Sequence, residues 1–243
     1  MTTTASSEEY LEAVYKLQQR EHPVRISKLA QSLGVAPASV TEMTKRLAQE
    51  GYLNRAEGVG VCLTQQGREA AVKTVRKHRL VERFLTDILG LPWEKVHDEA
   101  CRFEHVVSDE VEEGLERLLG EPTTCPHGFP IPEKHAGTAK DTQGAVPLCE
   151  LATGQSGKIL AVDEEDPAML SYLASLGLLP QVEIKVSEVA PFGGPQLVEV
   201  GGARYALGRE VASKVWVVPG DGKRPARAPH GARQARGARA KKS

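Results

Sequence analysis

Apolar residues recur at helical spacing through the first half of the chain. In residues 6–17 they lie on one face of an expected helix, with Ser6 and Glu9 forming a capping box at its start. Two more helices are predicted over residues 26–33 and 37–49, because a tight turn separates them and a proline opens the second. Two helices joined by a turn of a few residues form a helix-turn-helix pattern.

The next segments predict a hairpin wing and three further helices. Residues 53–63 form the expected hairpin, since Gly58 and Gly60 interrupt two short β-like runs. This wing completes a winged helix-turn-helix. Glycine and proline residues then separate helices predicted over residues 64–89, 93–107 and 108–120, of which Thr64 caps the first and Ser108 the last.

The pattern changes after residue 120. Several proline and glycine residues over 121–145 predict a linker without regular structure. From residue 146 onward, short β-like runs surround one helical patch, which predicts a small β-barrel. The expected fold class is therefore a mainly α N-terminal half followed by a small C-terminal β-barrel. After Pro219 the chain is rich in Lys, Arg, Ala, Gly and Pro, and we expect it to be disordered.

Composition narrows the class of protein. The chain of 243 residues has 40% hydrophobic residues, and its apolar runs fall far short of the roughly 20 residues that span a bilayer. The first residues lack the basic and apolar regions of a secretory signal, so we expect a cytoplasmic protein without a membrane partner. The net charge of −1 hides an acidic body, which suits cations, and a basic tail, which suits polyanions.

The four cysteines are scattered without a regular framework, which argues against disulfides in a cytoplasmic protein. Cys101 and Cys125 lie beside other metal-ligand residues. Cys62 and Cys149 lie among apolar residues, and we expect both to be buried free thiols.

The helix over residues 37–49 is the expected recognition helix of a DNA reader. Small residues in its first turns let a helix approach base edges, while hydroxyl and basic side chains bond bases or phosphates. The alternative is a three-helix packing unit with no ligand, but the exposed face lacks the apolar residues that packing would need. The candidate DNA contacts are Ser27, Ala36, Pro37, Ser39, Thr41, Glu42, Lys45, Arg46 and Arg55.

Ligand-type side chains recur at helical spacing between residues 78 and 105. Taken singly, each has a simpler explanation, such as a surface ion pair or a small core cysteine. Together they form faces of two consecutive helices that suit a divalent transition metal. A metal site beside a DNA reader predicts a metal-controlled switch. The pairs four residues apart are His78 with Glu82 and His97 with Cys101, and Glu104 and His105 follow.

The strings KHRLVERFLTDILGL, KVHDEACRFEH and VSDEVEEGLERLLG, with the winged helix before them, resemble the diphtheria toxin repressor family. That family includes iron-dependent and manganese-dependent regulators, and the resemblance covers roughly residues 6–218. It implies a winged helix-turn-helix domain over residues 1–70, a helical metal-binding and dimerisation domain over 71–120, the linker over 121–145, an SH3-like (FeoA-like) β-barrel over 146–219 and the basic tail over 220–243.

The resemblance implies two metal sites in each subunit. It assigns Cys101, Glu104 and His105 to the first site. Glu9 adds a ligand from the first helix, and His78 belongs to the same neighbourhood.

The second site implied by the resemblance uses the positions of His78 and Glu82. Iron-dependent members add the position of His97, whereas some manganese-dependent members use a Cys-Pro-His in the linker. This chain has both, the latter as Cys125 and His127. A barrel carboxylate usually completes the site, and the alternatives that stay open are Asp163, Glu164 and Asp166.

The ligand set leaves the metal between Mn²⁺ and Fe²⁺. In the family, iron-dependent members usually carry Met at position 9 and Cys at position 101, and manganese-dependent members a carboxylate at both. This chain mixes the two, with Glu9 and Glu12 on the first helix and Cys101 on the later one. We favour Mn²⁺ slightly, because the first helix offers two carboxylates and no thioether.

The function implied by the resemblance is metal-dependent transcriptional regulation. We expect a homodimer that binds a palindromic operator in double-stranded DNA and represses metal-uptake genes when metal bridges the first helix to the dimerisation helices. The sequence lacks an HExxH string, a nucleophile elbow and a phosphate loop, so we expect no enzyme activity and no small organic substrate. The alternatives are a metalloenzyme, a metal-sensing adaptor that does not bind DNA, and a winged-helix repressor that responds to an organic ligand.

Overall fold

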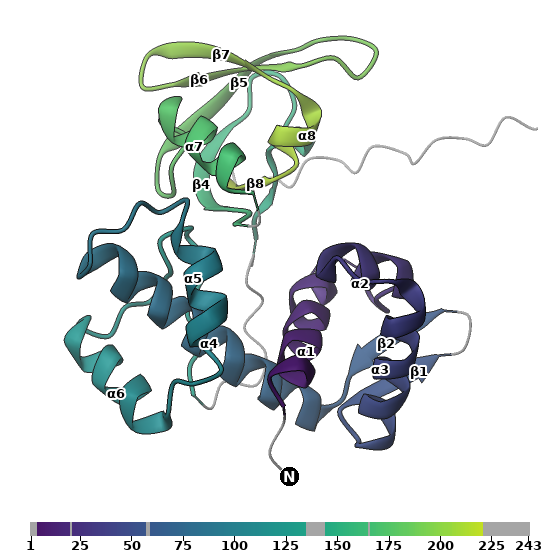
Figure 1. The fold of residues 1–243 in the computed structure, drawn as a ribbon. Coiled ribbons are helices and arrows are strands. Elements are labelled where there is room, and N and C mark those ends of the chain that lie inside the picture. The colour runs from purple at the N-terminus through teal and green to yellow at the C-terminus, as the bar shows by residue number, and fades with distance from the viewer. Residues whose placement is uncertain (1–3, 20, 57–58, 135–143, 165, 221–243) are drawn as a thin grey trace, which may run out of the picture.

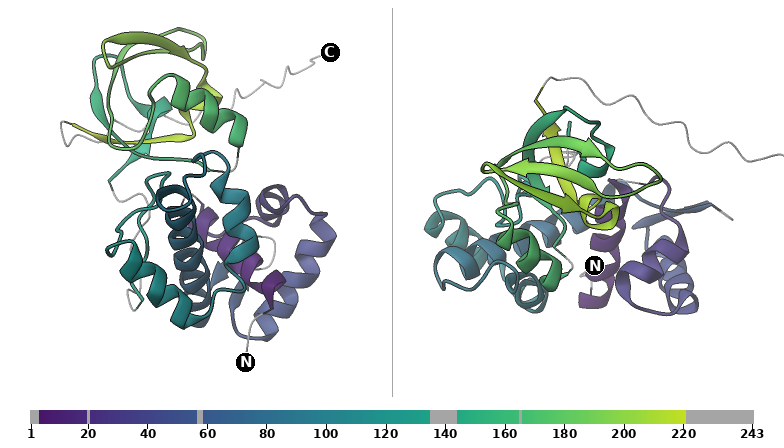
Figure 2. Two further views of the ribbon diagram at one scale, coloured as in Figure 1. Left: turned by 60° about the vertical axis from the view of Figure 1, so that its left-hand side comes forward. Right: turned by 90° about the horizontal axis from the view of Figure 1, so that it is seen from above.

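The computed structural model describes residues 4–19, 21–56, 59–134, 144–164 and 166–220. They form an N-terminal winged helix unit, a helical unit and a β-barrel, as Figure 1 shows. Seen from above, the barrel lies over the junction between the two helical parts (Figure 2). The expected fold class, a mainly α N-terminal half followed by a small barrel, is confirmed.

The winged helix unit has the elements that the apolar pattern predicts. One core holds it together: Leu11, Val14, Leu29, Val40 and Leu47 are all 0% exposed. Helices α2 and α3 are separated by a turn at Gly34, whose φ of 65° suits glycine. The elements are α1 (Ala5–Gln18), α2 (Ile26–Leu33), α3 (Pro37–Gln49), β1 (Leu53–Ala56) and β2 (Gly60–Leu63).

The start of α1 differs from the expectation. Thr4 is the N-cap, and its side chain accepts a hydrogen bond from the backbone N–H of Ser7. The predicted capping box of Ser6 and Glu9 is therefore wrong, because the helix begins at Ala5 and Ser6 already lies in its first turn.

The wing is an antiparallel pair in which Leu53 faces Leu63. It is attached to the segment before α2 by an isolated bridge between Val24 and Val61. Gly60 makes this approach feasible, since a Cβ at that position would lie 2.3 Å from the carbonyl oxygen of Val24. Gly58, which was expected in the turn of the hairpin, lies outside the described residues.

The helical unit consists of α4 (Gln65–Asp87), α5 (Val96–Phe103) and α6 (Asp109–Leu118). Thr64 and Ser108 cap α4 and α6 as predicted, each accepting a backbone hydrogen bond on its side chain. Helix α5 is shorter than expected, because residues 93–95 form a turn before it and the helix ends at Phe103. Glu104 and His105 therefore lie in the turn after α5 rather than on its face.

The barrel is built on a six-stranded antiparallel sheet with strand order β3-β8-β4-β5-β6-β7. The interior is apolar, with Leu148, Ile159, Leu170 and Val217 at 0% exposed. Strand β7 and the short α8 were not expected from the sequence. The elements are β3 (Val146–Pro147), a 3-10 turn (Leu148–Glu150), β4 (Ser156–Val162), α7 (Pro167–Ser175), β5 (Glu183–Val189), β6 (Gln196–Val200), β7 (Ala203–Leu207), α8 (Arg209–Ala212) and β8 (Val215–Pro219).

Residues 121–134 of the linker form a loop after α6 that packs against α4 and the barrel. The backbone N–H of Val162 donates to the carbonyl of His127 at 2.9 Å, and the Arg79 guanidinium donates to the carbonyl of Pro130 at 2.5 Å. Gly128 lies so close to β4 that a Cβ would come within 2.1 Å of the carbonyl oxygen of Leu160. Loop and barrel are thus fixed against each other at the position of His127.

All four cysteines are free thiols, which agrees with the expected absence of disulfides. Cys62 and Cys149 are half-buried rather than buried as expected, and Cys125 is the buried one. No described helix is both long and apolar enough to cross a membrane. The basic tail predicted after Pro219 lies beyond the described residues from position 221 onward.

Candidate metal centre

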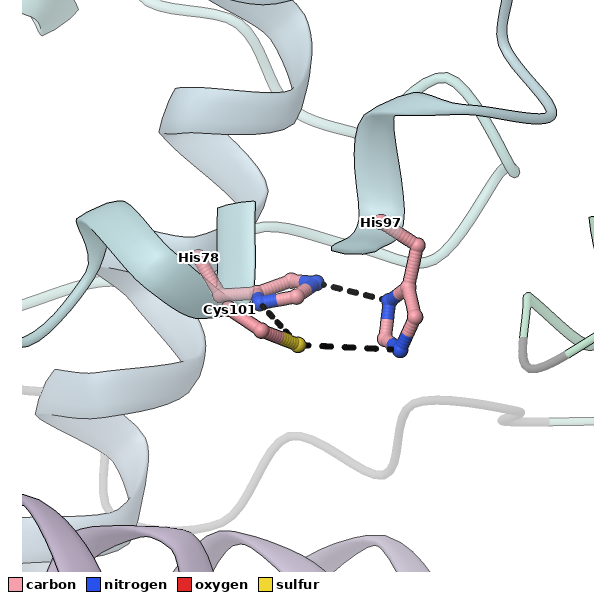
Figure 3. Close-up of side chains that lie close together, drawn as sticks. All are labelled: His78, His97 and Cys101. Carbon is pink, nitrogen blue, oxygen red and sulfur yellow. Dashed lines mark hydrogen bonds between the residues drawn. The ribbon is translucent and has the colours of Figure 1, made fainter. Parts of the chain in front are cut away.

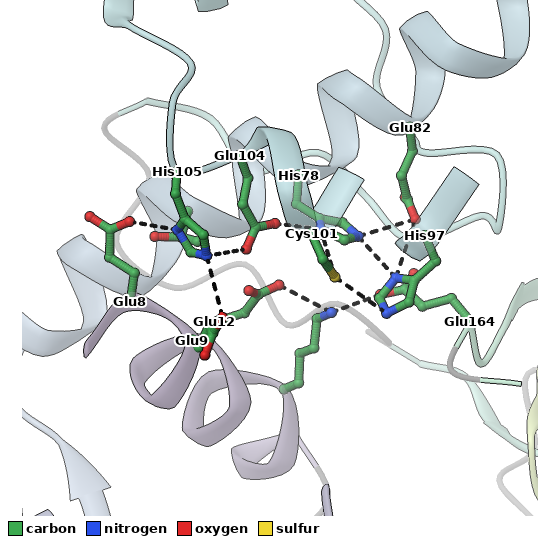
Figure 4. Close-up of polar contacts among 12 residues, drawn as sticks. Glu8, Glu9, Glu12, His78, Glu82, His97, Cys101, Glu104, His105 and Glu164 are labelled. Atoms are coloured by element: carbon green, nitrogen blue, oxygen red, sulfur yellow. Dashed lines mark hydrogen bonds and ion pairs between the residues drawn. The ribbon is translucent and has the colours of Figure 1, made fainter. Parts of the chain in front are cut away.

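Side chains from α1, α4, α5, the turn after α5 and the barrel meet around His78, as Figure 4 shows. His78 is 1% exposed. Its Nδ1 lies 2.5 Å from a carboxylate oxygen of Glu104, and its Nε2 lies 3.1 Å from Oε1 of Glu82 and 3.1 Å from Nδ1 of His97. This histidine therefore stands between two groups of ligand-type side chains.

The first group, called here the first centre, consists of Glu12, His78 and Glu104. One ligand atom from each lies within 4.8 Å of the other two, and all three residues are buried. Glu12 comes from α1 of the winged helix unit, whereas His78 and Glu104 belong to the helical unit. A single ion at this point would contact both units.

Cys101 flanks the first centre from α5. Its Sγ lies 4.0 Å from Nδ1 of His78 and 3.8 Å from Nε2 of His97 (Figure 3). These three residues form a further compact N, N, S group. The thiol is at the exposed side of the cluster.

The second group, called here the second centre, consists of Glu82, Cys125, His127 and Glu164. All four residues are buried, and their ligand atoms lie within 4.8 Å of one another. His97 borders it, with Nδ1 3.7 Å from Oε1 of Glu164. The structure thus brings together the iron-type histidine and the loop Cys-Pro-His, which the sequence offered as separate possibilities.

The imidazole of His127 is oriented by Trp93. Nε2 of His127 donates to the carbonyl of Trp93 at 2.8 Å, and the two rings stack with their centroids 5.4 Å apart. Nδ1 therefore faces the carboxylates, 3.3 Å from Oε1 of Glu82 and 3.6 Å from Oε2 of Glu164. A second hydrogen bond of this kind fixes the orientation of metal-binding histidines.

Several buried polar atoms in the second centre have no hydrogen bond. They are Nδ1 of His127, Oε2 of Glu82 and Oε2 of Glu164. Leaving buried polar atoms unpaired costs free energy unless something else satisfies them. Nitrogen, sulfur and oxygen donors aimed at one point fit a divalent transition metal, which would satisfy all three atoms.

The histidines of the cluster hold protons strongly in the metal-free chain. Burial lowers the pKa of His127, but the carboxylate of Glu82 outweighs it and the pKa rises to about 11. Burial also lowers the pKa of His97, but hydrogen bonds with Cys101 and Glu82 raise it to about 9. An ion that binds here must displace these protons.

The pKa values of the acidic groups in the cluster are shifted in both directions. Burial raises the pKa of the Cys101 thiol, but hydrogen bonds with the two histidines lower it to about 6. Burial raises the pKa of Glu104 to about 7. Burial would also raise the pKa of Glu164, but the nearby Lys16 ammonium outweighs it and the pKa falls to about 2. Cys101 and Glu164 are thus ionised at neutral pH and ready to bind a cation.

Glu9, the ligand that the resemblance implies from the first helix, lies at the edge of the cluster. Its side chain is 57% exposed, and its Oε1 is 3.9 Å from Nε2 of His105. Glu8 is closer, with Oε2 2.8 Å from Nδ1 of the same histidine. Sequence reasoning missed Glu8, and the helical position of Glu12 one turn further on proves to be the buried one.

Among the barrel carboxylates, Glu164 is the one that reaches the second centre. Asp163 accepts a hydrogen bond from the indole N–H of Trp216 at 3.1 Å and lies 3.3 Å from the ammonium of Lys214, inside the barrel. Asp166 caps α7 by accepting from the N–H groups of its first turn. These side chains are committed to the barrel itself.

The candidate DNA contacts lie at the surface of the winged helix unit. Apart from Thr41, which is half-buried and donates to the carbonyl of Pro37, all of them are exposed. Lys45 pairs with Glu42 at 2.8 Å and Arg46 pairs with Glu50 at 2.8 Å. The basic groups of α3 are thus presented to solvent together with the carboxylates of Glu42 and of the C-cap residue Glu50.

Family models match the chain in three segments. These are the "Iron dependent repressor, N-terminal DNA binding domain" over residues 2–61, the "Iron dependent repressor, metal binding and dimerisation domain" over 64–133, and the "FeoA domain" over 146–219.

Two kinds of relative agree with these matches. The chain is 35% identical over 222 residues to the iron-dependent repressor IdeR of Mycobacterium tuberculosis, covering 87% of this chain and 96% of that protein. It is 36% identical over 160 residues to the diphtheria toxin repressor of Corynebacterium diphtheriae, covering 65% and 71% of the two chains.

Solved structures give the same result. A manganese-dependent transcriptional repressor in complex with manganese superposes with a TM-score of 0.82 at 35% identity, over 87% of this chain and 99% of the other. ScaR with bound Cd²⁺ gives a TM-score of 0.76 at 32% identity, over 87% and 98%. The chain therefore belongs to the diphtheria toxin repressor family of metal-dependent transcriptional repressors.

Proposed function

We propose that this protein is a metal-dependent repressor whose homodimer binds an operator in double-stranded DNA when Mn²⁺ or Fe²⁺ fills its two centres. One observation carries the proposal. Glu12 belongs to the winged helix unit, and its carboxylate shares the first centre with His78 and Glu104 of the helical unit. The winged helix unit, which would bind DNA, and the helical unit thus share one cluster of candidate metal ligands.

The residues of the first centre suggest how metal would control DNA binding. Without a metal ion, the Lys16 ammonium, His78 and a proton on Glu104 balance the charge of the buried Glu12 and Glu104 carboxylates. These partners hold α1 to the helical unit less firmly than a divalent ion that both carboxylates share. A bound divalent ion supplies the positive charge that both carboxylates can share. Through Glu12, the ion would hold α1 against the helical unit. Because α1 and α3 belong to the same winged helix unit, this would also fix the orientation of α3. Because metal and DNA favour the same arrangement, each raises the affinity for the other.

Helix α3 and the wing are the proposed DNA-binding surface. Ser39 and Thr41 lie in the first turns of α3, the part of a recognition helix that reaches base edges in this class of DNA-binding domain, and Lys45 lies one turn after Thr41. Arg55 on β1 is exposed and suits contact with a neighbouring phosphate. Two copies of this surface in a dimer suit an inverted-repeat operator with half-sites about one helical turn apart.

An apolar surface on the helical unit is the proposed dimer interface. Large apolar side chains of this unit stay exposed in the single chain, including Phe103 at 48%, Val106 at 78% and Leu118 at 58%. Covering such side chains with a second copy would remove them from water. The family model that matches this segment is described as a dimerisation domain, which supports the assignment.

The donor atoms favour Mn²⁺ slightly over Fe²⁺. The first centre offers carboxylates from Glu12 and Glu104, and hard oxygen ligands suit Mn²⁺. Cys101 and Cys125 are softer donors that suit Fe²⁺ as well. The relatives include both an iron-dependent and a manganese-dependent repressor.

A metal titration of DNA binding tests the proposal. A duplex selected from a randomised library with the Mn²⁺-loaded chain would be titrated against chelator-treated protein, with Mn²⁺ or Fe²⁺ added under anoxic conditions. We expect tight binding only with metal, and loss of affinity with chelator. Equal affinity of the metal-free and loaded chains would contradict the proposal and favour a repressor that responds to an organic ligand. Metal binding without affinity for any duplex would favour a sensing adaptor.

A further inference from the structure

Lys16 places a positive charge between the two centres. It lies on α1 one turn after Glu12, and its Nζ is 3.1 Å from Oε1 of Glu12 and 2.8 Å from Oε1 of Glu164. Glu12 belongs to the first centre and Glu164 to the second. One ammonium therefore contacts a candidate ligand of each centre, and it also joins α1 to the barrel.

The Lys16 ammonium lies beside the carboxylates whose negative charge a bound metal ion would have to balance. A carboxylate that is paired with an ammonium has less negative charge to offer a metal, and an ammonium and a divalent ion repel each other at short range. Both carboxylates are buried, so water screens this competition poorly. The lysine therefore opposes metal binding at both centres while it stabilises the metal-free cluster.

The lysine is also placed so that it can leave. Its side chain is 27% exposed, whereas the side chains of Glu12 and Glu164 are 9% and 5% exposed. A lysine has a flexible four-carbon stem and a well-hydrated head, so the ammonium can turn toward water while the carboxylates stay in place.

We propose that Lys16 is a built-in competing cation that weakens metal binding at both centres and thereby sets the metal concentration at which this protein responds. The inference rests on the proposed metal-dependent function. It concerns the affinity of the centres rather than their existence.

The test is the Mn²⁺ affinity of the full chain in the absence of DNA. Chelator-treated wild type, Lys16→Met, Lys16→Gln and Lys16→Arg would be titrated with Mn²⁺, with free Mn²⁺ followed by electron paramagnetic resonance. The control is Lys28→Met, which removes one charge from an exposed lysine of α2. The melting temperature of each metal-free variant is measured in parallel.

Removal of the charge should tighten Mn²⁺ binding by about tenfold in Lys16→Met and Lys16→Gln. Lys16→Arg and the control should stay within about twofold of wild type. The metal-free Lys16→Met chain should melt at a lower temperature, because two buried carboxylates lose their cation. A purely structural lysine would lower the melting temperature without tightening metal binding.

Two results would overturn the inference, and they are distinguishable. Unchanged or weaker Mn²⁺ affinity in both neutral variants, with normal binding to wild type, would overturn the role of Lys16 alone. Absence of Mn²⁺ binding to the wild-type chain would overturn the metal centres and this inference together.

Discussion

The carboxylates of Glu12 and Glu104 meet beside His78, each of them buried, although one lies on the first helix and the other follows the fifth. Ligand oxygens of the two carboxylates lie within 4.8 Å of each other. Two buried carboxylates this close together are unfavourable unless protons or cations balance their charge. Burial raises the pKa of Glu104 to about 7, so part of this balance comes from a proton at neutral pH. The pair is therefore the natural place to test control by metal.

Glu12→Gln should raise the Mn²⁺ concentration needed for half-maximal DNA binding by about 100-fold, because the helix α1 loses its buried ligand. Glu9→Gln is the matched control, being a carboxylate of the same helix that is 57% exposed. It should change the midpoint by less than about tenfold. A gel-shift titration measures both, and a larger effect of Glu9→Gln would assign the bridging role to Glu9, as the family resemblance implies.

The metal-free chain should lose stability as the pH rises from about 6.5 to 9. The folded-state pKa values of His97 and His127 are raised to about 9 and about 11. Their contribution is complete below the unfolded pKa of about 6.5 and is lost as pH rises through the folded values. Cys101 acts in the opposite sense: because its pKa is lowered to about 6, its contribution to stability grows as the pH rises from about 6 to 9. The two histidines outweigh this single thiol.

Thermal unfolding between pH 6 and 9 in the presence of chelator checks this expectation. We expect the melting temperature to fall by about 5 °C across this range, because the folded chain keeps a few protons that the unfolded chain releases. Saturating Mn²⁺ should reverse the trend, because the ion competes with the same protons and binds better as they leave. A melting temperature that rises with pH in chelator would contradict the assigned protonation of the histidines.

Cys125→Ser and His127→Asn should each reduce the bound Mn²⁺ from two ions to one per chain, since both residues belong to the second centre. The midpoint of metal-activated DNA binding should rise about tenfold. Cys149→Ser is the control, because it removes a half-buried free thiol that packs against the barrel core, away from the second centre. Metal analysis after gel filtration gives the count, and two ions in His127→Asn would exclude His127 as a ligand.

Val106→Glu should weaken the dimer by about 100-fold by placing a charge in the proposed apolar interface. Phe192→Glu serves as the control, because Phe192 is the most exposed large apolar residue described, at 106%, and lies on the barrel. Sedimentation analysis of both variants measures the association. Loss of the dimer in Phe192→Glu with retention in Val106→Glu would move the interface to the barrel.

Local patterns were sufficient to predict most elements of this fold. The caps Thr64 and Ser108, the proline that opens α3 and the apolar spacing of α1 act within a few residues, and the helices lie where those signals put them. At the start of α1 a neighbouring hydroxyl residue replaced the expected cap, Thr4 in place of Ser6. Helix α5 is shorter than predicted, and β7 and α8 had no clear local signal.

The composition of the site was less predictable because it depends on tertiary contacts. The sequence left Asp163, Glu164 and Asp166 open. In the folded chain Asp163 accepts from Trp216, Asp166 caps α7, and Glu164 reaches the second centre. A Cys-Pro-His in a proline-rich segment suggested an exposed loop as readily as a ligand. The hydrogen bond between His127 and Val162 buries it.

The stacking of Trp93 on His127 gives this protein an optical signal of its own. The chain has two tryptophans, and the other, Trp216, is hydrogen bonded to Asp163 within the barrel. The indole of Trp93 shares its face with an imidazole whose charge must change when a cation replaces its proton. Emission from that ring therefore provides a label-free indicator of occupancy at one position, independent of any duplex or partner copy.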